Sequence, residues 1–338
     1  MKVSIWHNNK DIKIEETPTP KPGPKEMLVK VHSCGICGSD IVEWYRLPRA
    51  PLVQGHEIGA EVVEVGQSIK NYRPGDRVMI APKVPCLKCS YCKNGHYPAC
   101  SNVKERLPGG FAQYILVPEV LVEKGTYRLP DSISYDQSTF IEPLACVVRA
   151  QHLAGIKQGQ TVLVMGCGMS GLLHLKLAKT KKCTIIATDI NKTRLEFAKK
   201  IGADTVIDAS ENVPERLTAE IGRKADVVVL NTSALSAIDQ AWKCVDKGGC
   251  LVFFAVPGPD KPVTIPINIL WTQEIKVLTS YYCGPPDITE AIKLLEAGTI
   301  EVDDLVTHRL PLEDIEKGFR LVIEGQESIK VIIRPHEG

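Results

Sequence analysis

The segment Thr161-Val162-Leu163-Val164-Met165-Gly166-Cys167-Gly168-Met169-Ser170-Gly171 decides the fold of this 338-residue chain. Its first half is an apolar run that predicts a short strand, and the residues that follow, to about Thr180, predict a helix. The glycines between them have the pattern G-x-G-x-x-G, which permits a tight turn and a close approach of backbone to a pyrophosphate at the helix N-terminus. The pattern therefore predicts a dinucleotide site formed by Gly166, Gly168, Met169, Ser170 and Gly171.

An acidic residue follows the next predicted strand, Thr184 to Thr188. Asp189 lies eighteen residues past Gly171, where a carboxylate accepts hydrogen bonds from the adenosine ribose and repels a 2′-phosphate. We therefore expect NAD rather than NADP as the cofactor. Arg194 is a further candidate for contact with the cofactor, although its charge and that of Lys192 weaken the preference for NAD. The alternative is an ordinary strand-to-helix turn, with Asp189 as a loop residue.

The regions on the two sides of this turn have different patterns. On its C-terminal side strands alternate with helices, which predicts an α/β fold with a doubly wound parallel sheet. From about residue 3 to 140, short β-like runs broken by proline and glycine predict a mostly β, barrel-like domain. Since the chain is longer than a single core usually allows, we expect two domains. We place them at 1–144 and 145–278, with a segment at 279–338 that packs back onto one of them.

The overall charge argues against several classes of partner. The chain has 41 basic and 40 acidic residues, a formal charge of +1, so no net field favours nucleic acid or an anionic membrane surface. No apolar stretch has the length of a membrane span, and the N-terminus lacks an apolar signal core. We expect a cytoplasmic protein whose partner is a small molecule.

The cysteines indicate metal binding. Of the 12 cysteines, Cys86, Cys89, Cys92 and Cys100 crowd into one polar segment with spacing that suits a closed, tetrahedral structural zinc site in a loop at 86–100. Others lie in apolar runs as core thiols, which suits a reducing compartment. Disulfides, an iron–sulfur cluster or a zinc-ribbon interaction module are the alternatives, and the balanced charge argues against a nucleic-acid module.

A second constellation suits a reactive metal. Cys37 is followed nineteen residues later by His56 and then by Glu57. One thiolate, one imidazole and one carboxylate leave zinc an open position for water or substrate, as catalysis requires.

Together these motifs resemble the zinc-containing medium-chain dehydrogenase/reductase superfamily, and within it the sorbitol, threonine and sugar-alcohol dehydrogenases. The resemblance runs nearly end to end. It includes Cys-Gly-Ser-Asp at 37–40, Gly-His-Glu at 55–57, Pro-Gly-Asp-Arg-Val at 74–78, Glu-Pro-Leu at 142–144 and Val-Thr-His at 306–308. It implies a GroES-like catalytic domain, an inserted Rossmann domain that binds NAD, and a C-terminal segment that returns to the catalytic domain.

The resemblance also implies roles for individual residues. Cys37 and His56 are zinc ligands, Glu57 binds the zinc directly or through water, and Glu142 is the third protein ligand. Asp40 orients the histidine. Ser39 is the hydroxyl that relays the substrate proton; as an alternative it caps the next helix. Cys146 could compete with Glu142, and Cys34 is structural.

The predicted function is hydride transfer between a zinc-bound polyol or secondary alcohol and NAD, with one catalytic and one structural zinc in each chain of a homodimer or homotetramer. Many relatives carry a histidine that passes the proton outward where this chain has Val42. The sequence therefore does not identify the group that completes the outer proton path. Glu43 suggests amino-alcohols or amino-cyclitols, and threonine is a further alternative.

A zinc-independent quinone reductase and a methyltransferase are rivals that would not need the metal constellations. Trp44, Tyr45, Ile269 and Trp271 are candidates to line the substrate pocket, although core or interface positions suit them equally.

Overall fold

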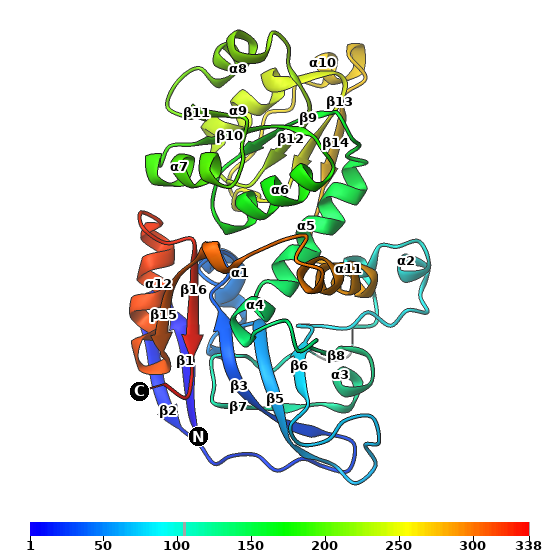
Figure 1. The fold of residues 1–338 in the computed structure, drawn as a ribbon, viewed down its shortest axis with the longest axis vertical. Coiled ribbons are helices and arrows are strands. Elements are labelled where there is room, and N and C mark those ends of the chain that lie inside the picture. The colour runs from blue at the N-terminus through cyan, green and yellow to red at the C-terminus, as the bar shows by residue number, and fades with distance from the viewer. Residues whose placement is uncertain (104–105, 338) are drawn as a thin grey trace. The chain divides into compact units, whose positions relative to one another are not determined.

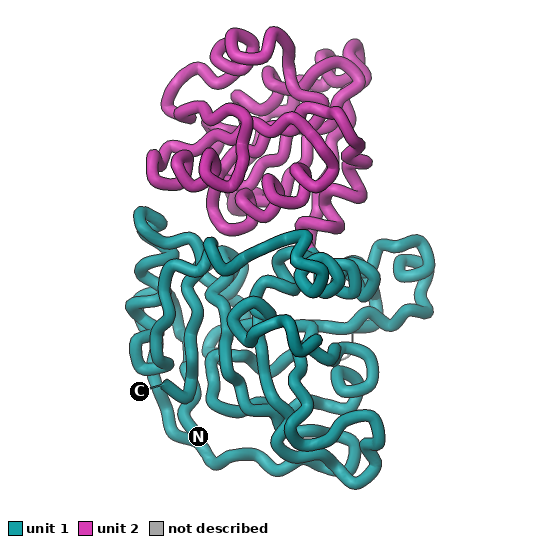
Figure 2. Tube along the Cα trace, in the orientation of Figure 1, with its two compact units in different colours: residues 1–145, 283–338 teal, residues 146–282 magenta. Residues whose placement is uncertain are grey.

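The computed structural model describes residues 1–103 and 106–337. The chain forms two compact units, coloured separately in Figure 2. Unit 1 consists of Met1–Ala145 and Cys283–Gly338, and unit 2 of Cys146–Tyr282. The sequence placed the two divisions at 144/145 and 278/279, close to those of the units.

Unit 2 is built on a six-stranded parallel sheet with strand order β11-β10-β9-β12-β13-β14. All of β9 is buried, as expected of a central strand in a parallel sheet with helices on its faces. The predicted doubly wound α/β sheet is thus confirmed (Figure 1). Its elements are β9 (Thr161–Met165), α6 (Met169–Thr180), β10 (Thr184–Asp189), α7 (Lys192–Lys200), β11 (Thr205–Asp208), α8 (Val213–Ile221), β12 (Ala225–Leu230), α9 (Leu235–Cys244), β13 (Val245–Phe253), α10 (Ile267–Thr272) and β14 (Lys276–Thr279).

Unit 1 contains a small sheet of order β2-β1-β4 and a larger one of order β15-β16-β3-β5-β6-β8, with β7 also paired to β3. Its strands are β1 (Lys2–Asn8), β2 (Asp11–Glu16), β3 (Met27–Gly35), β4 (Leu52–Val53), β5 (Glu57–Val65), β6 (Arg77–Ile80), β7 (Tyr114–Val117), β8 (Thr126–Arg128), β15 (Val306–Pro311) and β16 (Lys330–Arg334). Its helices are α1 (Glu43–Arg46), α2 (Ser90–Lys93), α3 (Glu119–Lys124), α4 (Tyr135–Ser138), α11 (Pro285–Glu296) and α12 (Ile315–Glu324), and α5 (Ile141–Ala154) leads into unit 2.

The C-terminal segment is an integral part of unit 1. Strand β16 pairs antiparallel with β3, with Ile333 opposite Cys34. The buried carboxylate of Asp136 accepts hydrogen bonds from Arg309 Nε and Arg334 NH2, both at 2.7 Å. Burial opposes ionisation of this carboxyl group, but the two arginines hold its pKa below its ordinary value. The larger sheet of unit 1 therefore includes strands from the C-terminal end of the chain, next to β3.

Two expected elements have different ends in the structure. The run from Ala60 to Val65 predicts a strand, but β5 begins at Glu57, because Glu57 still pairs with Gly35 across the ladder. Asp287 to Ala297 predicts a helix that begins at an acidic cap, but α11 begins at Pro285, with Gly284 as its N-cap. Asp287 instead lies inside the first turn and accepts the Gly284 N–H at 2.7 Å. Among the described residues no helix is long and apolar enough to cross a membrane.

Candidate functional site

Pairing of β3 with β5 assembles the first group of potential metal ligands. Gly35, the last residue of β3, lies opposite Glu57, the first residue of β5. Cys37 therefore follows one strand just where His56 precedes the other. One ligand atom from each of Cys37, His56 and Glu57 lies within 4.8 Å of the other two. The ladder thus brings together three of the four predicted ligands.

Glu57 is completely buried, and its two carboxylate oxygens differ. Oε2 accepts a hydrogen bond from the ammonium group of Lys330, which is also completely buried and lies 5.0 Å from the Phe140 ring. Oε1 has no hydrogen-bond partner among the described residues. A buried, unpartnered carboxylate oxygen costs free energy unless a cation or donor satisfies it. This oxygen is therefore available to a metal held by Cys37 and His56.

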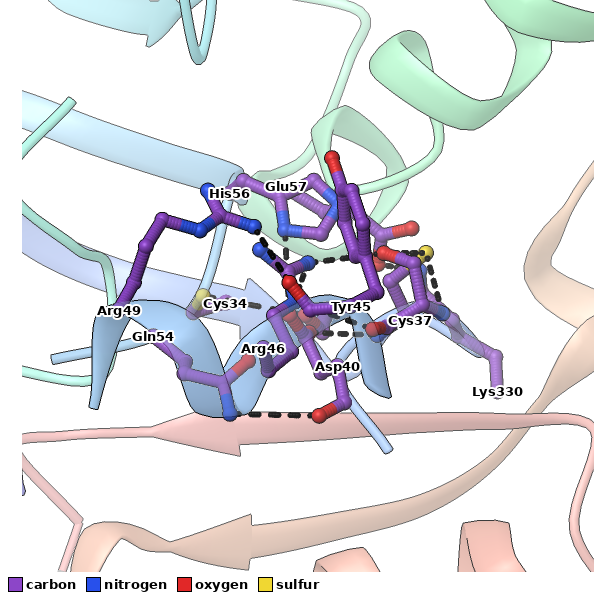
Figure 3. A network of polar contacts seen from close by, with 12 residues as sticks. Cys34, Cys37, Asp40, Tyr45, Arg46, Arg49, Gln54, His56, Glu57 and Lys330 are labelled. Carbon is purple, nitrogen blue, oxygen red and sulfur yellow. Dashed lines mark hydrogen bonds and ion pairs between the residues drawn. The ribbon is translucent and has the colours of Figure 1, made fainter. Parts of the chain in front are cut away.

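Asp40 holds His56 from the other side (Figure 3). Its Oδ1 lies 3.4 Å from His56 Nδ1, and its Oδ2 accepts the Cys37 N–H at 3.0 Å. Arg46 NH2 donates to Asp40 Oδ1 at 2.8 Å and to Ser39 Oγ at 2.9 Å. Ser39 Oγ in turn lies 3.3 Å from Cys37 Sγ. The predicted orienting carboxylate and relay hydroxyl are thus both beside the predicted ligands.

The charges in this group shift the pKa values of Asp40 and His56 in opposite directions. Burial opposes the charged form of both partners, but His56 and Arg46 hold the pKa of Asp40 below its ordinary value. In the same way Asp40 and Cys37 raise the pKa of His56 well above its usual range. A thiolate, an imidazole and a carboxylate whose ligand atoms lie within 4.8 Å of one another supply the donor set of an open zinc site. The residues present therefore fit a catalytic zinc.

Glu142, the other predicted ligand, lies in a different group. It is the second residue of α5 and is buried. Its carboxylate and the sulfur atoms of Cys146 and Cys283 lie within 4.8 Å of one another, and it is not part of the group around Cys37. Geometry therefore favours Glu57 over Glu142 as the carboxylate that completes the zinc site.

The four-cysteine loop also fits zinc. The Sγ–Sγ distances are 4.0 Å for Cys86–Cys92, 3.5 Å for Cys89–Cys92 and 4.0 Å for Cys89–Cys100. Zn–S bonds of about 2.3 Å in a tetrahedron place sulfur atoms about 3.8 Å apart. Backbone N–H groups also point at the sulfurs, with Cys86 N 3.2 Å from Cys100 Sγ. All 12 cysteines are free, so none of these contacts is a disulfide.

The glycine turn has the shape that phosphate binding requires. Gly166 has φ +99°, and a Cβ on Gly171 would lie 1.9 Å from the Gly166 carbonyl oxygen. Gly168 is the N-cap of α6 and has no side-chain cap. A Cβ there would meet nothing closer than Arg194 NH1 at 4.0 Å. The first N–H groups of α6, at Met169 and Ser170, are therefore open to an anion.

Asp189 is held at the end of β10 against the same turn. Its Oδ2 accepts the Cys167 N–H at 2.7 Å and its Oδ1 the Asn191 N–H at 2.8 Å. The Arg194 guanidinium lies over the turn, and its Nε is buried with no hydrogen-bond partner in the described chain. The predicted dinucleotide residues thus converge at one end of the unit 2 sheet.

Sequence reasoning missed two residues of the site, Arg46 and Lys330. The only sequence signal for Lys330 is a cation directly before the apolar residues 331–333, and it lies 273 positions from Glu57. The structure gives Glu43 a backbone partner, and it leaves Cys34, which the resemblance makes structural, outside the ligand groups. The Glu43 carboxylate accepts the Asn9 N–H at 3.0 Å, and Cys34 is buried in the core outside the ligand groups.

Comparison with known proteins agrees with this geometry. Residues 23–131 match the family model "Alcohol dehydrogenase GroES-like domain" and residues 171–297 match "Zinc-binding dehydrogenase". The chain is 34% identical to erythritol/L-threitol dehydrogenase of Mycolicibacterium smegmatis over 99% of this chain and 98% of that one. It is 32% identical to sorbitol dehydrogenase of Gallus gallus over 98% of this chain and 95% of that one. A solved structure from Sinorhizobium meliloti 1021, named as a zinc-binding dehydrogenase and bound to NADP, superposes with a TM-score of 0.88 at 28% identity, covering 99% of both chains.

Proposed function

This chain belongs to the zinc-containing medium-chain dehydrogenase/reductase superfamily and is an NAD(P)-dependent oxidoreductase of polyols and alcohols, and we propose that Cys37, His56 and Glu57 hold its catalytic zinc. The observation that carries this assignment is the cluster of their ligand atoms within 4.8 Å of one another, together with the buried and unpartnered Oε1 of Glu57. The four cysteines at 86–100 hold a second, structural zinc that has no open position.

The chain's own residues then have distinct tasks. A bound zinc supplies the positive charge that acidifies a substrate hydroxyl, and a bound nicotinamide supplies the hydride acceptor. Ser39 Oγ, 3.3 Å from Cys37 Sγ, would accept the substrate proton while its own hydrogen passes to solvent water, since Ser39 is only partly buried. Asp40 keeps His56 in its ligand orientation, since a ligating imidazole needs its second nitrogen held. Lys330 holds Glu57 in place by donating to its Oε2.

We further propose that NAD is the preferred cofactor, although the Sinorhizobium relative binds NADP. Asp189 is buried at the end of β10 and bonded to the glycine turn, so its negative charge faces the ribose of a bound dinucleotide. Titration of the protein with NADH and NADPH tests this. We expect tighter binding of NADH, with the preference lost in Asp189→Ala; a clear preference of the parent for NADPH would overturn it.

The substrate is proposed to be a polyol or a secondary alcohol rather than an amino-alcohol. Glu43 is the residue that suggested an amine. Its Oε1 already accepts a hydrogen bond from the Asn9 N–H, so this oxygen is not available to a substrate. A panel of hexitols, tetritols, vicinal diols, threonine and an amino-cyclitol, assayed by NADH production, tests the class. We expect turnover of hydroxyl-only substrates; activity on the amines alone would reverse the assignment.

We also propose a homo-oligomer that covers one apolar face of unit 2. Strand β14 is the last strand of its sheet, and Val277 on it is exposed. On the neighbouring α10, Ile267 is 70% exposed and Trp271 82%. Exposed apolar side chains beside an unpaired strand edge favour pairing with a second copy. Sedimentation analysis should show at least a dimer, and Val277→Lys with Trp271→Glu should dissociate it; an unchanged assembly would exclude this face.

We also propose that the protein is located in the cytoplasm. None of the 12 cysteines forms a disulfide in the structure, which supports a reducing compartment such as the cytoplasm. Blocking thiols with a maleimide before and after reduction of protein from its native cells tests this. We expect no difference in the number of blocked cysteines; a gain after reduction would indicate disulfides.

A further inference from the structure

Arg46 makes three hydrogen bonds beside the proposed zinc site, and no motif drew attention to it. It ends the short helix α1, and its guanidinium reaches back to Ser39 and Asp40 (Figure 3). Nε donates to the Ser39 carbonyl oxygen at 3.0 Å, and NH2 donates to Ser39 Oγ at 2.9 Å and to Asp40 Oδ1 at 2.8 Å. Only 11% of the Arg46 side chain is exposed. A buried guanidinium with this many directed bonds is held rigidly.

The contact with Asp40 affects His56. The oxygen that accepts from Arg46 is the same Oδ1 that lies 3.4 Å from His56 Nδ1. The Cys37 N–H holds the other carboxylate oxygen, so the carboxylate plane is fixed at both ends. Without Arg46, only the Cys37 N–H would hold the completely buried Asp40 carboxylate beside the imidazole. The direction of the His56 ring thus depends on Arg46 through Asp40.

The contact with Ser39 affects the hydroxyl that takes the substrate proton. A serine oxygen has one hydrogen to donate and two lone pairs to accept with. Arg46 occupies one lone pair, and Cys37 Sγ lies where the hydroxyl hydrogen can point, which leaves one lone pair for the substrate hydroxyl. Arginine stays protonated in proteins, so it cannot carry the proton onward. It can only fix the direction of the hydroxyl.

We propose that Arg46 is a positioning residue that aligns the proton-accepting Ser39 hydroxyl and the His56-orienting Asp40 carboxylate with a single guanidinium group. This inference rests on the proposed function of Ser39 and His56. It concerns how the site is held in this chain, where Val42 provides no side chain for an outward relay. A point charge would not suffice, because the two acceptors are reached by one planar group with fixed bond directions.

The test compares Arg46→Met, Arg46→Lys and the control Arg49→Met in the zinc-loaded enzyme. Arg49 suits a control because it lies on the next turn, donates to the Tyr45 carbonyl oxygen at 3.2 Å and stacks 4.8 Å from the Tyr45 ring, with an exposed side chain. The readouts are kcat and KM for alcohol and NAD, the rate of zinc release to a chromogenic chelator, and the melting temperature. Zinc release does not depend on turnover.

We expect Arg46→Met to lower kcat about 10–100-fold with both KM values changed less than about twofold, because positioning is lost while binding is kept. Release of the more labile zinc should accelerate by about tenfold or more. Arg46→Lys should fall between Met and the parent, and Arg49→Met should match the parent within about twofold.

The proposal is overturned if folded Arg46→Met keeps both kcat and the zinc-release rate of the parent within about twofold, or if KM rises while kcat is unchanged. If Arg46→Met does not fold, Arg46→Lys decides by the same criteria. If the parent turns over no alcohol, the proposed function fails, and the zinc-release rates still decide whether Arg46 holds the metal site.

Discussion

The pairs Cys34-x-x-Cys37 and Cys86-x-x-Cys89 have equal spacing, and the fold uses these two pairs differently. Cys86 and Cys89 lie on one loop, and both sulfurs join the same four-sulfur group. Cys34 and Cys37 lie at and beyond the end of β3, and only Cys37 joins potential ligands. Cys34 is completely buried in the core of unit 1. Equal spacing therefore does not predict equal function, because the backbone direction at each cysteine decides what its sulfur faces.

The physical difference is the element on which each pair lies. In β3 successive side chains alternate between faces, and the Cys34 sulfur fits against the backbone turns at Gly55 and Gly110, where a Cβ would come within 2.7 Å of it. The loop before α2 has no such alternation. Leu87 there has φ +59°, and this conformation turns the backbone around the sulfur of Cys86.

The largest effect should come from Cys37→Ser, because Cys37 belongs to the proposed catalytic site whereas Cys86 and Cys89 belong to the structural site. It removes a soft ligand from the open site, so we expect turnover to fall to background and one zinc to be lost, with the four-sulfur zinc retained. Zinc analysis and NADH production measure both. The melting temperature should stay near that of the parent. Full zinc content with parental turnover would contradict the assignment.

Cys89→Ser should act on stability rather than on chemistry. Loss of one of four thiolates opens a closed site, and the loop at 86–100 loses the metal that supplies its folding free energy. We expect loss of the tightly held zinc and rapid proteolysis within this loop, while the group around Cys37 still binds zinc. A loop that remains resistant to protease after the metal is lost would show that zinc is not what holds it.

Lys330→Met should have the next largest effect. It tests Glu57, the carboxylate that is present in the group around Cys37 and has no counterpart in the four-cysteine group. It leaves the Glu57 charge buried without its partner, which typically costs about 3–5 kcal/mol of unfolding free energy. Urea unfolding of chelator-treated protein measures the loss. Zinc should restore part of it if Glu57 is a ligand, and Glu57→Gln in the same background should restore part without zinc. No recovery in either case would remove Glu57 from the site.

Cys34→Ala should have the smallest effect and completes the comparison. A buried thiol is removed without touching a ligand group, so we expect full zinc content, turnover within about twofold and a loss of about 1 kcal/mol in unfolding free energy. Zinc analysis and urea unfolding are sufficient. Loss of zinc in this variant would place Cys34 among the ligands and make the two pairs equivalent after all.

The features predicted well from sequence are those whose residues are close in the chain. The strand, turn and helix around Gly166–Gly171 and the acid at Asp189 were predicted because βα units place such residues at regular spacing. The fold class is confirmed for the same reason. Strand β14 was missed, since Lys276–Thr279 has only two consecutive apolar residues, too short a run to indicate a strand.

The features that sequence could not predict depend on long-range packing. Lys330 reaches Glu57 only because β16 pairs with β3, and no spacing rule relates positions so far apart. Arg46 is near Asp40 in sequence, but whether a short helix turns its arginine back or outward depends on burial. Glu142 has a family role by resemblance, and the structure instead places it beside Cys146 and Cys283. Its part in metal binding stays a prediction.

Zinc-edge anomalous diffraction from crystals of the enzyme purified without chelator tests the central claim most directly. The account predicts a peak within about 2.0–2.3 Å of Cys37 Sγ and of a His56 nitrogen, with Glu57 as the nearest carboxylate, and a second peak among the four cysteine sulfurs. A fully active enzyme with a peak only at the cysteine loop, or with zinc bound by Glu142 and not by His56, would contradict it.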